Sequence, residues 1–124
     1  MPTLKQPTAF LATINAEQSR DFYVDRLGLS LVGDEPFALV FDAGGTMLRI
    51  QKVEELTPAR HTVLGWAVDD IEVSINELTA KGIAFARYDH IGQDELGVWN
   101  SPSGARIAWF KDPDGNVLSL TQHP

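Results

Sequence analysis

Hydrophobic and polar positions alternate along the chain in a way that predicts two similar halves, each starting with a strand and a helix. The apolar run TAFLATI predicts a buried strand over 8–14. The spacing of Phe22, Tyr23 and Leu27 then predicts a helix over 16–26. Further short strands are predicted in this half at 30–33, 37–42 and 47–51.

The second half follows the same order. A strand is predicted over 62–68, and Ile71, Ile75 and Leu78 form the apolar stripe of the next helix. Three more strands are predicted at 83–88, 106–111 and 117–121. The polar stretch 89–104 between them is expected to be a long loop that contains Trp99 and an extra short strand.

Residues with known preferences for helix ends mark both helices. Asn15 is expected to cap the start of the first helix, and Gly28 to end it. Asp69, with Glu72 three residues later, is expected to cap the second helix, which Gly82 ends. The same order of a capping residue, a helix and a final glycine in both halves favours a duplicated unit over two unrelated helices.

The two halves also match residue against residue. The segment GTMLRI at 45–50 aligns with GNVLSL at 115–120. We therefore predict an α+β fold of two βαβββ modules, 8–51 and 62–121, joined by a linker over 52–61 into a single domain over 1–124. Each module alone leaves one face of its sheet bare, so two modules, from one chain or from two, must cover each other.

Composition narrows the class of protein. Seventeen acidic residues against ten basic ones give a net charge of −7, which disfavours nucleic acid and mildly favours cationic or neutral ligands. The chain has no cysteine, which excludes disulfides and thiolate metal sites and fits a reducing cytoplasm. Apolar runs such as 37–41 are too short to cross a membrane. We expect a cytoplasmic protein without nucleic-acid or membrane partners.

Two segments resemble a known family. The run WFKDPDGNVLSL at 109–120 is similar to the terminal hairpin of the vicinal oxygen chelate superfamily, which contains glyoxalase I, bleomycin-resistance proteins, extradiol dioxygenases and fosfomycin-resistance enzymes. The run NAEQSRDFYVDRLGL at 15–29 resembles its first helix. The resemblance covers about 8–121 and implies paired βαβββ modules forming a cupped mixed sheet around a pocket, usually in a homodimer. In the hairpin turn, Asp112 is expected to accept backbone hydrogen bonds and Gly115 to adopt a positive φ.

The resemblance also implies where a metal would bind. Metal-using members place His and Glu ligands at four strand positions, which fall here on Thr8, Arg49, Val63 and Ser119. None of these is a usual ligand, and the permanent charge of Arg49 repels a cation. If the register of the fifth strand is shifted by two residues, His61 is the only usual metal ligand that reaches one of these positions. We therefore predict no metal and no cofactor, and we assign no catalytic residue.

Strand alternation selects a set of pocket residues. If the four ligand positions face the pocket, alternate residues of the same strands share that face, and the repeat adds one aromatic residue from each half. Trp99 is expected to close over the pocket from its loop. The candidate ligand-binding residues are Phe10, Phe41, Arg49, Gln51, Trp99, Trp109 and Ser119. Two alternatives stay open: the aromatic side chains fill the core, or Arg49 pairs with an internal acid such as Asp42 rather than with a ligand carboxylate or enolate.

These features predict a metal-free protein that binds a small molecule, resembling the bleomycin-resistance branch and sequestering an aromatic or cationic drug or metabolite. One alternative is a metal-dependent lyase, isomerase or dioxygenase that uses His61 with Gln51 and a residue of a partner chain. Another is a metal-free enzyme in which Arg49 stabilises an oxyanion and His90 acts as the base. The sequence identifies neither the ligand nor the way in which the modules pair.

Overall fold

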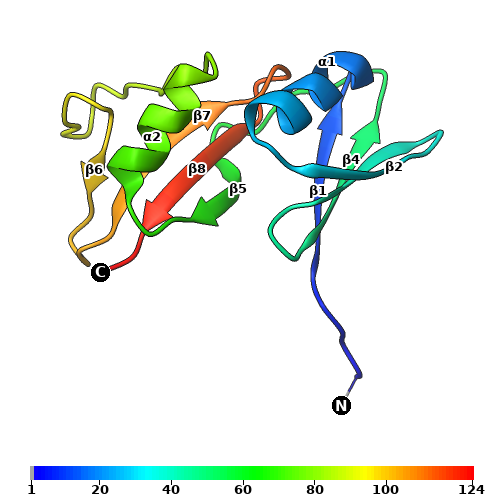
Figure 1. Ribbon diagram of the computed structural model, residues 1–124, viewed down its shortest axis with the longest axis horizontal. Coiled ribbons are helices and arrows are strands. Elements are labelled where there is room, and N and C mark those ends of the chain that lie inside the picture. Colours follow the sequence, from blue (N-terminus) through cyan, green and yellow to red (C-terminus); the bar gives the residue numbers. More distant parts are fainter. Residues whose placement is uncertain (1) are drawn as a thin grey trace. The chain divides into compact units, whose positions relative to one another are not determined.

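Two four-stranded mixed sheets, each accompanied by a helical segment, make up the protein in the computed structural model, which describes residues 2–124 (Figure 1). The chain divides into two compact units, Met1–Thr57 and Pro58–Pro124, and the division falls inside the predicted linker. Each unit is described here by itself.

The first unit has the predicted βαβββ order. Its strands pair in the order β1-β4-β3-β2, with β1 parallel to β4 and the other pairs antiparallel. The predicted helix over 16–26 forms as one helical segment whose second half is widened into a π-helix. The elements are β1 (Thr8–Thr13), α1 (Ala16–Asp21), η1 (Phe22–Arg26), β2 (Ser30–Asp34), β3 (Ala38–Asp42) and β4 (Met47–Lys52).

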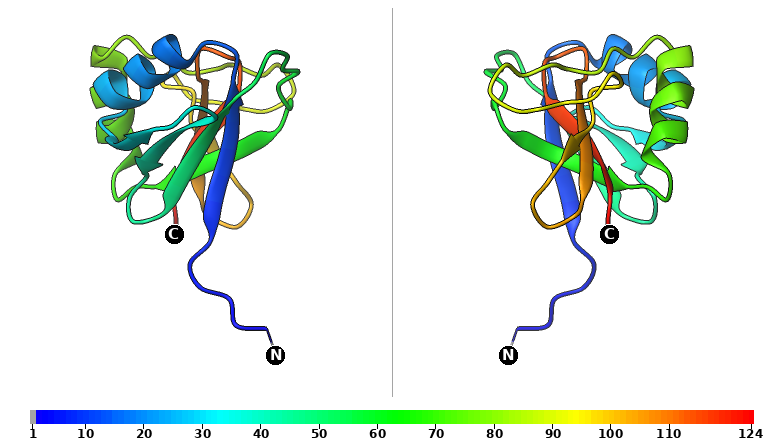
Figure 2. Two further views of the ribbon diagram at one scale, coloured as in Figure 1. Left: turned by 90° about the vertical axis from the view of Figure 1, so that its right-hand side faces the viewer. Right: turned by 90° about the vertical axis from the view of Figure 1, so that its left-hand side faces the viewer.

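The second unit repeats this topology. Its strands pair in the order β5-β8-β7-β6, again with a parallel first pair and antiparallel others. Helix α2 lies against one face of this sheet (Figures 1 and 2). The elements are β5 (Thr62–Ala67), α2 (Ile71–Ala80), β6 (Trp99–Asn100), β7 (Arg106–Lys111) and β8 (Val117–Gln122). Both modules therefore confirm the predicted fold class.

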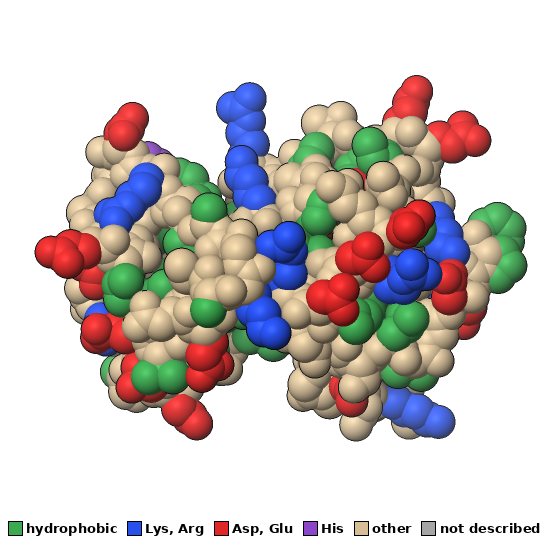
Figure 3. All heavy atoms as spheres, turned by 45° about the horizontal axis from the view of Figure 1, so that its top comes forward, with side chains coloured by type: hydrophobic (Ala, Val, Ile, Leu, Met, Phe, Trp, Pro, Cys, Tyr) green, Lys and Arg blue, Asp and Glu red, His purple; other side chains and the backbone are tan. Residues whose placement is uncertain are grey.

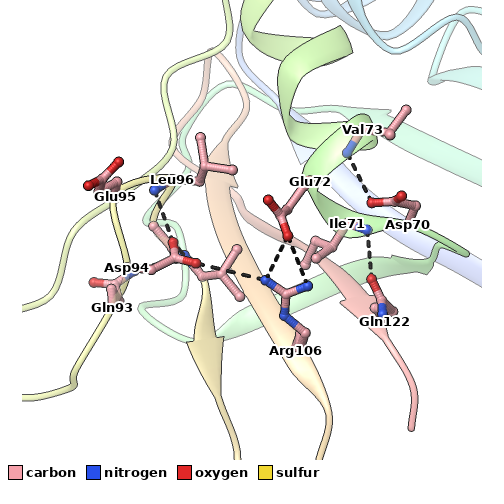
Figure 4. Close-up of polar contacts among 12 residues, drawn as sticks. Asp70, Ile71, Glu72, Val73, Gln93, Asp94, Glu95, Leu96, Arg106 and Gln122 are labelled. Atoms are coloured by element: carbon pink, nitrogen blue, oxygen red, sulfur yellow. Dashed lines mark hydrogen bonds and ion pairs between the residues drawn. The ribbon is translucent and has the colours of Figure 1, made fainter.

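The predicted helix ends are confirmed with one change. The Asn15 side chain accepts a hydrogen bond from the Gln18 amide at 3.1 Å. The second helix begins one residue later than predicted, so Asp70 rather than Asp69 is its N-cap and accepts from the Val73 amide at 3.2 Å. Gln122 supplies a second cap from β8, because its Oε1 accepts from the Ile71 amide at 2.8 Å (Figure 4).

The prediction of a strand over 83–88 is wrong. This segment is irregular and joins the sheet through one bond, from the Ala86 amide to the Trp109 carbonyl at 2.7 Å. The Gln93 side chain occupies the backbone groups that a neighbouring strand would need: its Oε1 accepts from the Tyr88 amide and its Nε2 donates to the Ala86 carbonyl. The second strand of the module is instead β6, inside the stretch predicted as a loop with an extra strand.

The turn between β7 and β8 has the hydrogen bonds to Asp112 and the backbone conformation at Gly115 that the sequence predicted. The buried Asp112 carboxylate accepts from the backbone amides of Asp114 at 3.0 Å and Asn116 at 2.9 Å, and from the Asn116 side chain at 2.8 Å. Gly115 has φ +90°, a conformation that glycine adopts without steric cost. The turn residues are therefore architectural.

Candidate functional site

In the first unit, three of the predicted site residues share the sheet face that points away from the helix. Phe10 and Arg49 are partners in the pairing of β1 with β4, and Gln51 lies two residues beyond Arg49 on the same face. Phe10 is 56% exposed, so its ring is not part of the buried core of the unit. The structure brings these residues together as predicted.

Phe41, however, lies on the opposite face, which corrects the sequence prediction. It pairs with Leu48, is fully buried, and its ring lies 5.6 Å from that of Tyr23 in the helical segment. The turn between β3 and β4 spans residues 43–46, whereas the turn between β7 and β8 spans 112–116 and is one residue longer. Counting back from the matched glycines therefore shifted the alignment by one residue, which reverses the face of every side chain in a strand.

Arg49 forms an ion pair with an acidic residue of its own unit, which was one of the two alternatives for the partner of its charge. Its Nη2 lies 2.9 Å from Glu35 Oε1, so the partner is Glu35 and not Asp42, whose carboxylate accepts from the Gly45 amide at 2.7 Å. The Arg49 side chain is 30% exposed and that of Glu35 is 52% exposed. The charge of Arg49 is thus already compensated within the unit.

In the second unit, three further predicted residues also share a face. Trp109 pairs with Ser119, and Trp99 pairs with Ile107, which lies on the same face as Trp109. The Trp99 and Trp109 rings are 6.1 Å apart with an angle of 34° between their planes. The Trp109 Nε1 donates to Thr62 Oγ1 at 3.0 Å, which fixes the tilt of the indole.

Tyr88 completes this group, and the sequence did not identify it. Its ring meets Trp109 edge-on, with 5.7 Å between the ring centres and an angle of 85°. Tyr88 lies at the end of the segment that was predicted as a strand, so nothing in the sequence placed it next to Trp109. We call Tyr88, Trp99 and Trp109 the aromatic cluster.

Polar contacts hold the loop that carries Tyr88 and leads to Trp99. The Gln93 side chain bonds three backbone groups of the loop, at Tyr88, Ala86 and Gly97. The Arg87 guanidinium donates to the carbonyls of Asp94 and Glu95. The loop is therefore built as a fixed structure, which positions the aromatic cluster in advance.

A second set of contacts ties this loop to β7 and α2. The Asp94 carboxylate accepts from the amides of Leu96 and Val98, each at 2.9 Å, and lies 3.8 Å from Arg106 (Figure 4). Arg106 also pairs with Glu72 of α2 at 3.3 Å. The loop thus keeps a fixed position relative to the sheet.

Small side chains leave the sheet open beside Trp109. Gly65 and Ala67 on β5 are exposed on the face of Ser119. A Cβ atom at Gly65 would lie 2.4 Å from Ser119 Oγ, so no other side chain fits there without displacing the serine. The glycine leaves a flat area of sheet within reach of a ligand.

A concavity of about 400 Å³ lies on the same unit, next to the aromatic cluster. Tyr88 forms part of its wall, and Lys111 and Val117 reach it from the sheet face that also carries Trp109 and Ser119. The residues that line it are Pro58, Ala59, Arg60, Tyr88, Lys111, Gly115 and Val117.

The residues present do not fit a bound divalent metal. The four positions inferred from the resemblance hold threonine, arginine, valine and serine. Within residues 2–124, no group of three or more His, Cys, Asp or Glu side chains is placed to hold an ion. His61 and His90, the histidines of the two enzyme alternatives, are both exposed.

Charges at the surface are mixed. On the face that Figure 3 draws, basic side chains lie singly or in small groups between acidic ones.

In the first unit, a hydrogen bond from Lys52 at 2.5 Å lowers the pKa of the Asp34 carboxyl, and Arg20 at 3.9 Å contributes a smaller effect in the same direction. None of the helices in residues 2–124 has the length and apolar character needed to span a bilayer.

Comparison with known proteins identifies the family. The model of the Glyoxalase/Bleomycin resistance protein/Dioxygenase superfamily matches residues 5–120. The chain belongs to this superfamily. The match spans both modules, so the repeat found in the sequence is that of the superfamily fold.

Solved structures agree with this assignment. The antibiotic binding protein TnmS3 from Streptomyces sp. CB03234 is 26% identical, with a TM-score of 0.75 over 100% of this chain and 99% of that chain. A superfamily member from Sphaerobacter thermophilus is 23% identical, with a TM-score of 0.75 over 98% of both chains. TioX from Micromonospora sp. ML1 is 18% identical, with a TM-score of 0.72 over 97% and 99%. No protein of curated function matches the chain significantly.

Proposed function

We propose that this protein binds a small organic molecule that contains an aromatic ring system, without a metal and without changing it chemically. The observation that carries the proposal is the aromatic cluster on an open sheet face. Ring centres 5.7 and 6.1 Å from Trp109 place three aromatic surfaces around one location. Favourable ring pairs contribute roughly 0.5–1.5 kcal/mol beyond the area they bury.

The surroundings of the cluster support a binding role over simple core packing. Tyr88, Trp99 and Trp109 are only partly buried, whereas the core aromatic residue Phe110 of the same sheet is fully buried. Gly65 is exposed and pairs with Ser119, which in turn is the strand partner of Trp109. Partly exposed aromatic side chains beside a concavity are typical of small-molecule sites.

The relatives give the proposal a direction. TnmS3, at 26% identity over almost its whole length, is described as an antibiotic binding protein. We infer that the ligand here is likewise a drug or metabolite and that the protein acts by sequestering it; the aromatic rings of the ligand are inferred from the aromatic cluster alone.

The two enzyme alternatives have less support. A metal-free enzyme needs Arg49 to stabilise an oxyanion, but its guanidinium already pairs with Glu35 at 2.9 Å. A metal enzyme needs ligands that the four implied positions do not offer. Equilibrium dialysis against Ni²⁺, Zn²⁺ and Mn²⁺ tests this point, and stoichiometric uptake of any of them would overturn the metal-free part of the proposal.

Fluorine NMR of protein labelled with 5-fluorotryptophan tests the binding site directly. The chain has three tryptophans, and Trp66 is the internal control because it lies on the other face of its sheet, opposite Leu120. With 2-naphthamide as the probe, we expect the Trp99 and Trp109 signals to shift and the Trp66 signal to stay. Three equal shifts, or none, would contradict the proposed site.

We also propose that the protein works as a homodimer in the cytoplasm. Exposed apolar side chains in the first unit support association, among them Phe37 at 80% and Phe10 at 56% exposure. The cysteine-free sequence is compatible with a reducing compartment. Native mass spectrometry of the purified protein reads the oligomeric state, and a monomer at micromolar concentration would contradict the dimer.

A further inference from the structure

We propose that the ligand is an aromatic acid, whose anionic group is bound by Arg60 and Lys111 in the concavity beside the aromatic cluster. This inference rests on the proposed binding function and adds the charge of the ligand. It runs against the expectation from net charge, which favoured a cationic or neutral molecule.

The concavity is part of the same surface as the aromatic cluster. Tyr88 belongs to both, because it packs edge-on against Trp109 and also lines the hollow. Lys111, at the end of β7, pairs with Val117, at the start of β8, on the face that carries Trp109 and Ser119. An aromatic ring stacked on Trp109 can thus direct a substituent past Tyr88 into the hollow.

A glycine shapes the opposite wall. A Cβ atom at Gly115 would lie 3.2 Å from the Pro58 ring, so glycine lets the segment 58–60 approach the turn between β7 and β8. Arg60 of this segment lines the hollow together with Lys111 of β7. Two cations from separate segments therefore line one concavity of about 400 Å³.

These two cations lack the partners that other basic residues of the unit have. Arg87 donates to two loop carbonyls, and Arg106 pairs with Glu72 and Asp94. Among residues 2–124, neither Arg60 nor Lys111 forms an ion pair or a side-chain hydrogen bond. No carboxylate lines the hollow either, and the neighbouring Asp112 is committed to its own turn.

The two positive charges that line the hollow favour the binding of an anionic group there. Two like charges on one concave surface raise the local potential, and an anion bound between them relieves their repulsion. The guanidinium of arginine offers a planar set of donors that matches a carboxylate, and lysine adds a point charge. An aromatic acid satisfies both parts of the surface at once, since its ring meets the aromatic cluster and its anion meets the cations.

A matched set of probes tests the inference on the complete chain. We would measure dissociation constants by isothermal titration calorimetry for 2-naphthoate, neutral 2-naphthamide and the cation 2-naphthylmethylammonium. We expect 2-naphthoate to bind about tenfold more tightly than 2-naphthamide, with the cation weakest, because only the carboxylate forms charge-assisted contacts with the two cations. Added salt should weaken only 2-naphthoate substantially.

Variants assign the effect to the two residues. K111M and R60Q should each reduce the preference for 2-naphthoate over 2-naphthamide several-fold, because each removes one of the two cations proposed to contact the carboxylate. K5M is the matched control, because Lys5 is an exposed residue of the first unit and its loss changes the net charge equally. Fluorine signals of Trp99 and Trp109 report whether each variant keeps the aromatic cluster intact.

The outcomes separate this inference from the proposed function. Equal binding of 2-naphthoate and 2-naphthamide, with the Trp109 signal shifting for both, would overturn the anion site and keep the aromatic site. Tightest binding of the cation, or an equal effect of K5M and K111M, would also overturn it. Failure of all three probes to bind would overturn the proposed function together with this inference.

Discussion

Replacing Asp112 with alanine gives the sharpest test of how the turn between β7 and β8 is stabilised. The carboxylate accepts three hydrogen bonds between 2.8 and 3.0 Å, two from backbone amides and one from the Asn116 side chain. Both Asp112 and Asn116 are only 5% exposed, so water cannot easily replace the lost acceptor. Each bond to a charged acceptor contributes roughly 1.5–3 kcal/mol, but such neighbouring bonds are not additive.

We therefore expect D112A to lower the free energy of unfolding by about 3 kcal/mol. For a chain of this size that corresponds to a midpoint about 2 M lower in urea and a melting temperature about 10 °C lower. Urea unfolding followed by far-ultraviolet circular dichroism measures the change. The slope of the transition should stay the same, because the exposed area on unfolding does not change.

Two further variants separate hydrogen bonding from other effects. D112N keeps an oxygen for the backbone amides but brings two amide groups together at position 116, so about half of the loss should remain. Combining D112N with N116D exchanges donor and acceptor and should recover about 1 kcal/mol relative to D112N alone. A loss below about 0.5 kcal/mol for D112A, or no recovery in the exchanged pair, would refute the reasoning.

Three other predictions follow from contacts elsewhere in the chain. Q93A removes three hydrogen bonds from the loop of the aromatic cluster, so amide exchange at 86–98 should accelerate about tenfold while the rest of the sheet stays protected. K52M removes the main cause of the lowered pKa of Asp34, so a carbon-13 titration should show a higher pKa for this carboxyl in the variant. In the native protein, the ion pair of Lys52 with Asp34 stabilises the fold at pH values above the ordinary aspartate pKa, and this stabilisation is lost as the pH falls through the lowered pKa. G65A should destabilise the second unit by about 1–2 kcal/mol in urea unfolding, and S119A in the same chain should restore most of the loss, because the new Cβ meets Ser119 Oγ at 2.4 Å.

The fold was predictable from sequence because each signal acts over a short range. Asn15 starts the first helix and Gly28 ends it for local reasons, and an N-cap residue and a glycine likewise start and end the second helix. The repeated hairpin sequence then required two modules of the same order. The strand over 83–88 failed because its backbone groups are bonded by the Gln93 side chain, a contact that no local pattern announces.

The candidate site was predictable only in part, and the misplaced residue shows why. Strand alternation put Arg49 on the face of Phe10 correctly, since both assignments depend on one strand pair. Phe41 depended on carrying the alignment through a turn, where one extra residue in the second module reverses the face. Tyr88 was missed because only the three-dimensional course of the loop brings it to Trp109.

The net charge of the chain and the charges near the concavity lead to different expectations for the ligand. The net charge of −7 is a property of the whole chain and suggested a cationic ligand. A bound ligand, however, responds mainly to nearby charges that are not already paired. Salt largely screens the charges that lie farther from it than about 10 Å. Arg49, the cation that the sequence singled out, is neutralised by Glu35, whereas Arg60 and Lys111 line a concavity that contains no carboxylate. Pairing, and not the number of charges, therefore decides which region of this acidic protein attracts an anion.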